Sequence, residues 1–224
     1  MRIAFAGFRH GHVLSVLQEV RRRDDVEIVA ACEADPAARE QAAAQHGVRF
    51  THADYAEMLA GTACDAVVVG DYYARRGEIV IAALTAGRHV LSDKPICTDL
   101  GQWERIADLA RGGGLCVGCQ LDLRWSPKFR TMRRLIGEGA VGEVHTVTFL
   151  GQHPLLYGTR PAWYFEPGRH GGTINDIGVH GLDLVGWLTG RRLVEVVAAR
   201  AWNARLPAAP AFQDAAQLML RMDN

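Results

Sequence analysis

Short apolar runs alternate with segments of helical periodicity through the first half of the chain, and this pattern restricts the folds it can adopt. The run at residues 2–7 (RIAFAG) ends in glycine, and apolar residues then recur at helical spacing from Val13 to Val20. The same order repeats downstream. Further strands are expected at residues 26–32, 65–70, 89–93 and 115–120, and further helices at 36–46, 77–87 and 100–111. Strands separated by such helices form a parallel sheet that is covered on both faces.

The loop after the first expected strand, residues 7–12 (GFRHGH), has the position of a phosphate-binding loop. In a parallel sheet, ligands bind at the carboxyl ends of the strands, near the point where the strand order reverses. Gly7 lets the backbone approach a pyrophosphate, and the following helix offers free N–H groups to it. A complete G-x-G-x-x-G pattern would also place glycines where this chain has Arg9 and His12. The loop by itself is therefore weak evidence for a dinucleotide.

Glu33 strengthens this interpretation because it ends the second expected strand, at the distance from the loop that dinucleotide-binding folds use for an acidic residue. A carboxylate at this position accepts hydrogen bonds from the ribose hydroxyls and repels a 2′-phosphate. NAD is therefore favoured over NADP. The alternative is a surface carboxylate beside Asp35.

Residues 171–190 (GGTINDIGVHGLDLVGWLTG) place three ionisable side chains on one expected helix, namely Asp176, His180 and Asp183. Positions i, i+4 and i+7 share a helix face, so the three groups can converge on one volume. A histidine beside a carboxylate is a common arrangement for moving a proton near neutral pH. The alternative is a helix whose polar face simply meets solvent.

Composition excludes several function classes. Lys and Arg number 25, as do Asp and Glu, so no overall field attracts nucleic acid or an anionic membrane. The chain has neither a signal peptide pattern nor an apolar run long enough to span a membrane, and a cytoplasmic location is expected. The five cysteines are an odd number, as in reduced intracellular proteins. Cys116 and Cys119 form a CxxC without two further ligands at matching spacing, so no metal site is expected.

Two separated segments carry a specific resemblance. Residues 82–99 (AALTAGRHVLSDKPICTD) are similar to an A-L-x-A-G-K-H-V-x-x-E-K-P block, and residues 171–190 to a G-G-G-x-x-x-D-x-G-x-H-x-x-D-L-x-x-W-L-x-G block. Residues 64–70 (CDAVVVG) and 137–147 (GEGAVGEVHTV) also lie at matching places. Over essentially its whole length the chain resembles the glucose-fructose oxidoreductase / inositol dehydrogenase / rhizopine-catabolism family of NAD(P)-dependent oxidoreductases.

The resemblance implies an α/β protein with two domains. Residues 1–122 would form a dinucleotide-binding Rossmann domain, a doubly wound parallel sheet. Residues 123–224 would form an α/β domain for substrate binding and oligomerisation, with an open, mainly antiparallel sheet that is shortened relative to the family. Its strands are expected at residues 142–151, 193–202 and 215–222.

The chain ends at Asn224, whereas family members generally continue further. The gene is short, the chain is truncated, or another chain completes the sheet. Because an open sheet edge is normally paired or covered, a homo-oligomer is expected, either a dimer or a tetramer.

The resemblance also implies the chemistry, which is hydride transfer between a nicotinamide and a hydroxyl-bearing carbon of a sugar, polyol or similar small molecule. Lys94 and His180 would meet at the nicotinamide with Asp176 beside them. His180 would act as the base, and Lys94 would stabilise negative charge on the substrate oxygen. Residues expected at the cofactor are Gly7, Phe8, Arg9, His10, Gly11, His12, Glu33, Asp71, Asp93 and Lys94. Residues expected at the substrate are Lys94, Arg124, Trp163, Asp176 and His180.

Three local departures from the family pattern leave other functions open. The loop at residues 7–12 lacks two glycines, residues 70–76 (GDYYARR) replace a T-P-x-x-x-H segment, and Asp93 replaces glutamate. The chain could be an NAD(H)-binding regulatory protein with weak or no turnover, or a scaffold that uses its open sheet. The joint presence of Lys94, Asp176 and His180 favours an enzyme, because a pure sensor needs no base beside the nicotinamide.

Overall fold

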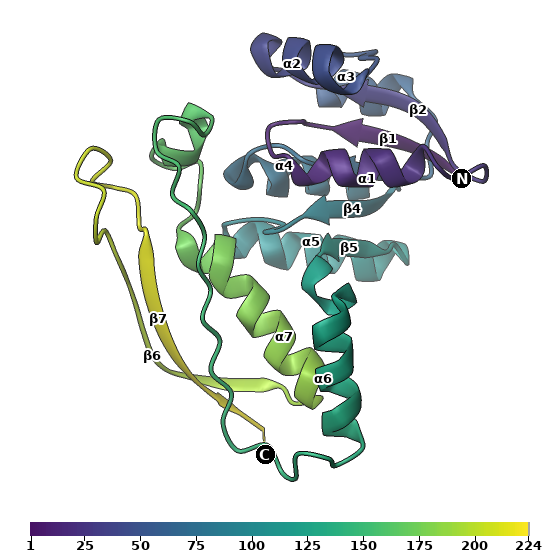
Figure 1. Cartoon of the computed structure of the whole chain (residues 1–224). Helices are drawn as coiled ribbons and strands as arrows, with labels where there is room; N and C mark the ends of the chain where they lie inside the picture. The colour runs from purple at the N-terminus through teal and green to yellow at the C-terminus, as the bar shows by residue number, and fades with distance from the viewer. Residues whose placement is uncertain (224) are drawn as a thin grey trace. The chain divides into compact units, whose positions relative to one another are not determined.

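The computed structural model describes residues 1–223, which divide into two compact units between Gln120 and Leu121. The first unit contains a parallel sheet of five strands in the order β2-β1-β3-β4-β5 (Figure 1). Its strands are β1 (Arg2–Ala6), β2 (Glu27–Cys32), β3 (Ala66–Val69), β4 (His89–Asp93) and β5 (Val117–Gln120). Its helices are α1 (His12–Val20), α2 (Pro36–His46), α3 (Tyr55–Gly61), α4 (Tyr73–Thr85) and α5 (Leu100–Gly113). The parallel sheet predicted from the sequence is confirmed.

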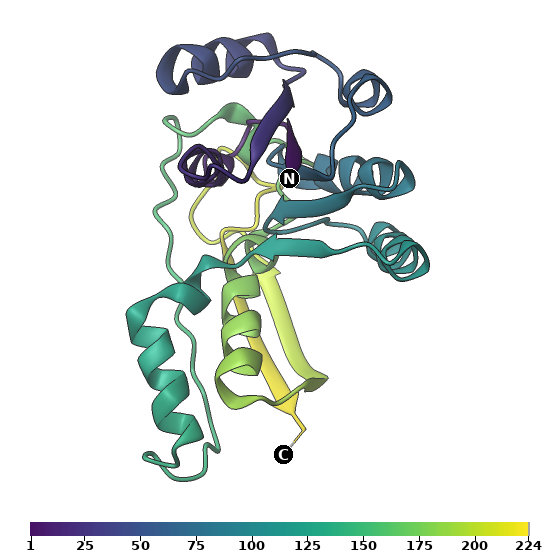
Figure 2. The same cartoon turned by 90° about the vertical axis from the view of Figure 1, so that its right-hand side faces the viewer.

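The helices cover both faces of this sheet, α1 and α2 on one side and α3, α4 and α5 on the other (Figure 2). Alternate strand residues point to opposite faces. Ala4, Ala6, Val67 and Val69 therefore pack with side chains of α3, α4 and α5, whereas Ile3, Phe5 and Val68 pack with side chains of α1 and α2. Two apolar cores hold the strands rigidly, so the loops at their carboxyl ends start from fixed positions.

Local signals set the ends of α2. Pro36 occupies the first turn, where its missing N–H costs nothing, and the Asp35 carboxylate accepts a hydrogen bond from the N–H of Ala38 at 2.8 Å. Gly47 ends the helix in the left-handed conformation, with a φ of 60°. Both ends agree with the sequence prediction.

Two helices of the first unit differ from the expectation. The helix α3 was not among the expected elements, and it begins after Asp54, whose carboxylate caps it through the N–H groups of Ala56 and Glu57. The helix α4 begins at Tyr73 rather than at residue 77. This extra turn places Arg76 on the buried face of the helix.

The second unit contains two α-helices and an antiparallel strand pair. The helices are α6 (Pro127–Gly137) and α7 (Val179–Thr189), and the strands are β6 (Leu193–Trp202) and β7 (Ala215–Met222). Three short helical turns accompany them, η1 (Asp122–Trp125), η2 (Ala162–Phe165) and η3 (Ile174–Gly178). The helices α6 and α7 pack together, and β6 and β7 run side by side as a long hairpin (Figure 1).

The prediction of a strand at residues 142–151 is wrong. This segment forms no strand in the structure, and nearly all of its residues are exposed. Alternating hydrophobicity shows only that a segment is compatible with a strand, since a strand also needs a partner edge for its N–H and C=O groups. Among the described residues of this unit, β6 and β7 pair only with each other. No helix in the part of the chain that the structure describes is long and apolar enough to cross a membrane.

Candidate functional site

The loops that follow β1 and β3 touch at the carboxyl edge of the first unit's sheet. These strands are neighbours, and the chain leaves them toward opposite sides of the sheet, which makes this the point where the strand order reverses. Gly7 has a φ of 85°, and a Cβ built on it would lie 2.6 Å from the Cβ of Asp71. A Cβ on Gly70 would lie 2.5 Å from the Cβ of Val13. Glycine at these two positions therefore lets the loops after β1 and β3 and the start of α1 pack more closely than side chains would allow.

Glu33 lies at the same edge, directly after β2, with 1% of its surface exposed. One carboxylate oxygen accepts a hydrogen bond from the N–H of Phe8 at 2.6 Å, and the other from the N–H of Asp35 at 2.8 Å. Burial raises the pKa of Glu33 above its ordinary value, although the two backbone hydrogen bonds oppose that shift. Glu33 thus joins the loop after β1 to the loop after β2.

A small pocket opens beside these groups, and Gly7, Glu33, Tyr55, Asp71 and Arg75 contribute to its lining. Asp71 is buried, and burial raises the pKa of its carboxyl group as well. Arg75 approaches this carboxylate to 3.6 Å. Two carboxylates on the wall of one pocket favour hydroxyl donors such as a ribose and disfavour an added phosphate.

The remaining residues of the loop differ in what they contribute. Phe8 is buried, and its ring stacks at 5.9 Å from that of Phe5, so only its backbone faces Glu33. Arg9 reaches toward the end of β2, where its guanidinium lies 3.1 Å from the Asp35 carboxylate. A Cβ on Gly11 would meet nothing within 4 Å, so no close contact requires glycine at that position.

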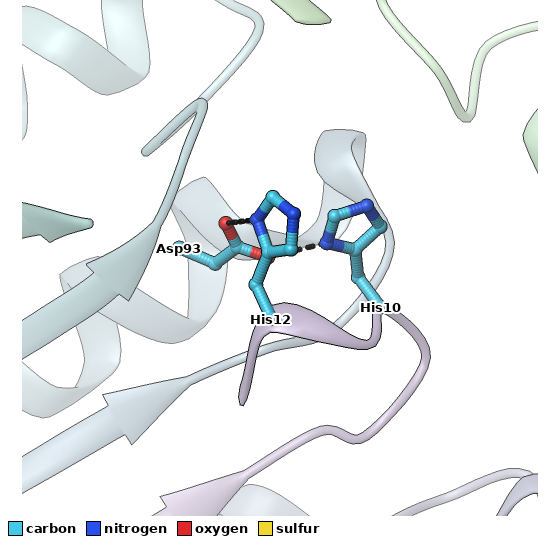
Figure 3. A group of neighbouring side chains, drawn as sticks. All are labelled: His10, His12 and Asp93. Carbon is cyan, nitrogen blue, oxygen red and sulfur yellow. Dashed lines mark hydrogen bonds and ion pairs between the residues drawn. The ribbon is translucent and has the colours of Figure 1, made fainter. Parts of the chain in front are cut away.

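His10 and His12 both bind the carboxylate of Asp93, the last residue of β4 (Figure 3). The Nδ1 atom of His10 lies 2.6 Å from one oxygen, and that of His12 lies 3.1 Å from the other. The Nε2 atom of His10 lies 3.2 Å from the hydroxyl of Tyr73 at the start of α4. If His10 donates from Nδ1 to the carboxylate, its Nε2 accepts from Tyr73, so both ring nitrogens of His10 have a partner.

Charge and burial set the protonation of this group. Burial by itself would raise the pKa of Asp93, but hydrogen bonds from His10 and His12 and the charge of Arg76 outweigh it and hold the pKa well below its usual range. Burial lowers the pKa of His10, and the hydrogen bond to Asp93 opposes this shift only in part. At neutral pH the group therefore contains an ionised carboxylate and a neutral His10.

The ligand-type atoms of His10, His12 and Asp93 lie within 4.8 Å of one another, which raises the question of a metal. Two ligands of one tetrahedral zinc ion, each about 2.0–2.1 Å from the metal, lie roughly 3.3 Å apart. The separation of 2.6 Å between His10 and Asp93 is instead that of a shared proton, and the guanidinium of Arg76 already lies 2.9 Å from the same carboxylate. The described geometry suits a hydrogen-bonded cluster better than a metal centre.

Lys94 follows directly after β4 and is buried, with 3% of its surface exposed. Its ammonium nitrogen lies 5.7 Å from the centre of the Tyr73 ring. Arg76 of α4, whose side chain is fully buried, donates to the carbonyl oxygens of Lys94 and Pro95 as well as to Asp93. Arg76 was absent from the predicted site. Extending the helical pattern of α4 by one turn would have placed it on the same face as Val80 and Ala83.

In the second unit, Asp176 is buried within the turn η3, which has π-helical hydrogen bonding and leads directly into α7. Its carboxylate accepts a hydrogen bond from the hydroxyl of Tyr164, and the Nε2 atom of His170 lies 3.4 Å away. Burial and the charge of Asp176 raise the pKa of Tyr164. His170 was not among the predicted site residues. Single π-helical turns of this kind are frequent at functional sites.

The three ionisable groups expected on one helix face have different surroundings. His180 lies half-buried in the first turn of α7. Asp183 forms a two-point ion pair with Arg124, in which Nε lies 2.8 Å from one carboxylate oxygen. The sequence pattern suggested that Asp183 joins Asp176 and His180 in an acid–base group. In the structure its carboxylate instead holds Arg124. Trp163 is buried, and its ring centre lies 5.7 Å from that of Tyr164.

The titration of His10 tests the description of the cluster. In the protein without ligands, the His10 ring should titrate below pH 6.5, the ordinary histidine value, when followed by NMR of its ring resonances. Asp93→Asn should lower the midpoint further, because Asp93 raises the His10 pKa. Arg76→Met should raise it, because the charge of Arg76 lowers it. A wild-type midpoint above 6.5 would contradict the geometry described. So would a higher midpoint in Asp93→Asn or a lower one in Arg76→Met.

Both units match known families. Residues 1–121 match the model of an oxidoreductase family with an NAD-binding Rossmann fold, and residues 129–224 match that of the GFO/IDH/MocA C-terminal domain.

Individual proteins agree with these matches. Inositol 2-dehydrogenase 2 of Saccharopolyspora erythraea is 29% identical over 198 residues, which are 88% of this chain and 56% of that protein. The 1,5-anhydro-D-fructose reductase of Ensifer adhaerens is 31% identical over 162 residues, which are 70% of this chain and 47% of that protein. The chain thus spans about half the length of these relatives. The crystal structure of myo-inositol 2-dehydrogenase from Lactobacillus plantarum has the same fold, with a TM-score of 0.83 and 22% identity over 99% of this chain and 66% of that one.

Proposed function

Because the chain belongs to the GFO/IDH/MocA family of oxidoreductases, we propose that it serves hydride transfer between a nicotinamide cofactor and a hydroxyl-bearing carbon of a sugar, polyol or related small molecule. The observation that carries this proposal is the carboxyl edge of β1, β2 and β3, where Gly7 of the loop after β1 and the Glu33 carboxylate line one small pocket. The relatives named as an inositol dehydrogenase and an anhydrofructose reductase support the substrate class.

The cofactor in this proposal is NAD rather than NADP. Glu33 and Asp71 present carboxylates to the pocket where the ribose would lie, and a 2′-phosphate would meet their charge. Arg9, the cation nearest the end of β2 in the loop, is already paired with Asp35. The 2′-phosphate would have to displace that carboxylate to gain the arginine.

Cofactor choice is therefore testable with two single variants. NAD(H) should bind more tightly than NADP(H) in calorimetric titration, and Glu33→Ala should reduce this preference by removing the acceptor for the ribose hydroxyls. Asp35→Ala should strengthen NADP binding because it frees Arg9 for the phosphate. Exchange of the exposed Glu40 to Ala is a matched control that should leave both affinities unchanged. Tighter binding of NADP by the wild type would refute the assignment.

The proposed chemistry assigns separate tasks to Lys94, His180 and Asp176. A bound nicotinamide supplies the hydride acceptor or donor. An alcohol that loses a hydride must also lose its hydroxyl proton, and His180 as a neutral imidazole takes that proton. Lys94 as a cation stabilises the negative charge that develops on the oxygen. Asp176 contributes negative charge next to the first turn of α7, which supports a protonated imidazole.

Replacement of these groups separates catalysis from cofactor binding. Lys94→Ala and His180→Ala should each lower kcat by about 10²–10⁴-fold while NAD affinity changes little, because positioned acid–base groups act mainly on the chemical step. Lys128→Ala and His145→Ala, at exposed positions of the second unit, are the controls. A screen of polyols for formation of reduced cofactor provides the assay. Unchanged kcat with weakened NAD binding would show that these residues bind rather than catalyse.

A second candidate function follows from the altered loop. Arg9 and His12 stand where glycines would complete the phosphate-binding pattern, and His12 is bound to Asp93. A loop held in this way suits an NAD(H)-binding regulatory protein with weak or no turnover. Binding of NAD without reduction by any tested polyol would favour this candidate.

The second unit also supports a proposal of self-association. Leu193, Val194, Val196 and Val197 of β6 and Met219 of β7 are exposed, and each has 45% or more of its surface accessible. Exposed apolar side chains along a strand pair commonly mark an interaction surface. We expect a homo-oligomer, most simply a dimer with two-fold symmetry, in which this surface is covered.

Analytical ultracentrifugation measures the oligomeric state directly. The chain should sediment as an oligomer at micromolar concentration, and the double variant Val194→Glu/Val196→Glu should shift it toward monomer without loss of secondary structure, because buried charge opposes association. Gln217→Glu, at an exposed position of β7, adds a charge without removing an apolar side chain and tests whether charge alone is responsible. A stable wild-type monomer would contradict the proposal.

A further inference from the structure

Arg76 is a fully buried cation to which the proposed chemistry assigns no role. Its Nε donates to the carbonyl oxygen of Asp71 at 2.8 Å, and its Nη2 donates to the carboxylate of Asp93 at 2.9 Å. Its Nη1 donates to the carbonyl oxygen of Lys94 and, at 3.2 Å, to that of Pro95. The guanidinium also lies 4.5 Å from the centre of the Tyr73 ring. One side chain therefore connects the loop after β3 with the loop after β4.

We propose that Arg76 is the positioning residue for Lys94, and that Asp93 with its two histidines ties this lysine to the dinucleotide loop. The inference rests on the proposed function, in which Lys94 stabilises charge on the substrate oxygen. Arg76 donates to the carbonyl of the Lys94–Pro95 peptide and to that of the following Pro95–Ile96 peptide, so it restrains the backbone directly after the lysine side chain.

The burial of this arginine supports a specific role. Removing a guanidinium from water is costly unless its donors are satisfied, and here Nε, Nη1 and Nη2 all have acceptors on the protein. The acceptors belong to Asp71, Lys94 and Asp93, and the planar guanidinium, with five N–H groups on three nitrogens, can bond all of them at once. A lysine ammonium would retain the charge but carries all of its donors on one nitrogen. The site therefore requires the shape of arginine as well as its charge.

The connection continues from Asp93 to the loop after β1. The Asp93 carboxylate accepts from Arg76 and is bound by the Nδ1 atoms of His10 and His12. Tyr73, stacked near Arg76, is hydrogen-bonded to His10, and the Lys94 ammonium lies near the same ring. The loop proposed to hold the cofactor and the lysine proposed to act on the substrate thus share Tyr73 of α4, and Asp93 links the same loop to Arg76.

Arg76→Lys is the main test because it retains the charge and removes the fork. A displacement of about 1 Å at a positioned group can cost 10²-fold in rate, so we expect kcat to fall about 10–100-fold while NAD affinity and the KM for the alcohol stay within about threefold. When Arg76→Lys is added to Lys94→Ala, kcat should fall no further, because no lysine remains to be positioned. Arg111→Lys, at an exposed position of α5, is the matched control.

A measurement without cofactor or substrate complements the kinetics. Hydrogen exchange of the free protein should be faster in Arg76→Lys for peptides that cover residues 90–98, and unchanged for peptides of β6 and β7. If Arg76→Lys does not fold, Asp93→Asn takes its place, since it removes one anchor of the guanidinium with little change in volume. The same fall in kcat and the same faster exchange of residues 90–98 are expected, and NAD affinity is not used as a criterion for this variant because Asp93 also binds the histidines of the cofactor loop.

The outcomes separate this inference from the function on which it rests. Absence of turnover in the wild type, or full activity of Lys94→Ala, would refute the proposed chemistry, and hydrogen exchange would then decide whether Arg76 restrains residues 90–98. With an active wild type and an impaired Lys94→Ala, positioning is overturned if kcat is unchanged in both Arg76→Lys and Asp93→Asn. It is also overturned if the fold-loss in kcat of the double variant equals the product of the losses in the two single variants, because the two residues would then act independently.

Discussion

The buried ion pair between Arg76 and Asp93 is the interaction on which the functional edge of the first unit depends. Both side chains are fully shielded from solvent. The effective cost of burying an unpaired charge is several kcal/mol, so removing either group leaves the other buried without its ionic partner. The remaining donors and acceptors of the pair reach three loops, those after β1, β3 and β4. The pair thereby connects these three loops around the backbone that carries Lys94.

Three buried carboxylates at this edge behave differently because their partners differ. Burial raises the pKa of both Glu33 and Asp71, whose hydrogen bonds come mainly from backbone N–H groups. Asp93 is equally buried, yet two histidines and an arginine lower its pKa. The edge is thereby divided into an acidic part suited to ribose hydroxyls and a neutralised part that supports Lys94. Burial alone would raise the pKa of all three carboxyl groups, and the histidines and arginine bound to Asp93 reverse the sign of the shift there.

In the second unit, a π-helical turn alters an argument made from helical spacing. The i, i+4 and i+7 pattern of Asp176, His180 and Asp183 assumes one regular helix, whereas η3 ends at Gly178 and α7 begins at Val179. A turn with i to i+5 hydrogen bonds rotates the residues before it relative to those after it. Asp176 is therefore buried with Tyr164 and His170, and Asp183 binds Arg124. The acidic residues that looked equivalent have separate surroundings.

The sequence by itself determined the alternation of strands and helices, the parallel sheet, the places of Gly7 and Glu33, and the family, because these depend on local periodicity and on short motifs. Only the tertiary structure decided which groups meet. Nothing local to Arg76 indicates that it bonds Asp93, 17 residues away, or that His10 reaches the same carboxylate across 83 residues. The same limit explains residues 142–151, whose strand-like pattern lacks a partner edge. Periodicity describes how a segment can present its side chains, whereas pairing and charge compensation depend on what the folded chain brings opposite them.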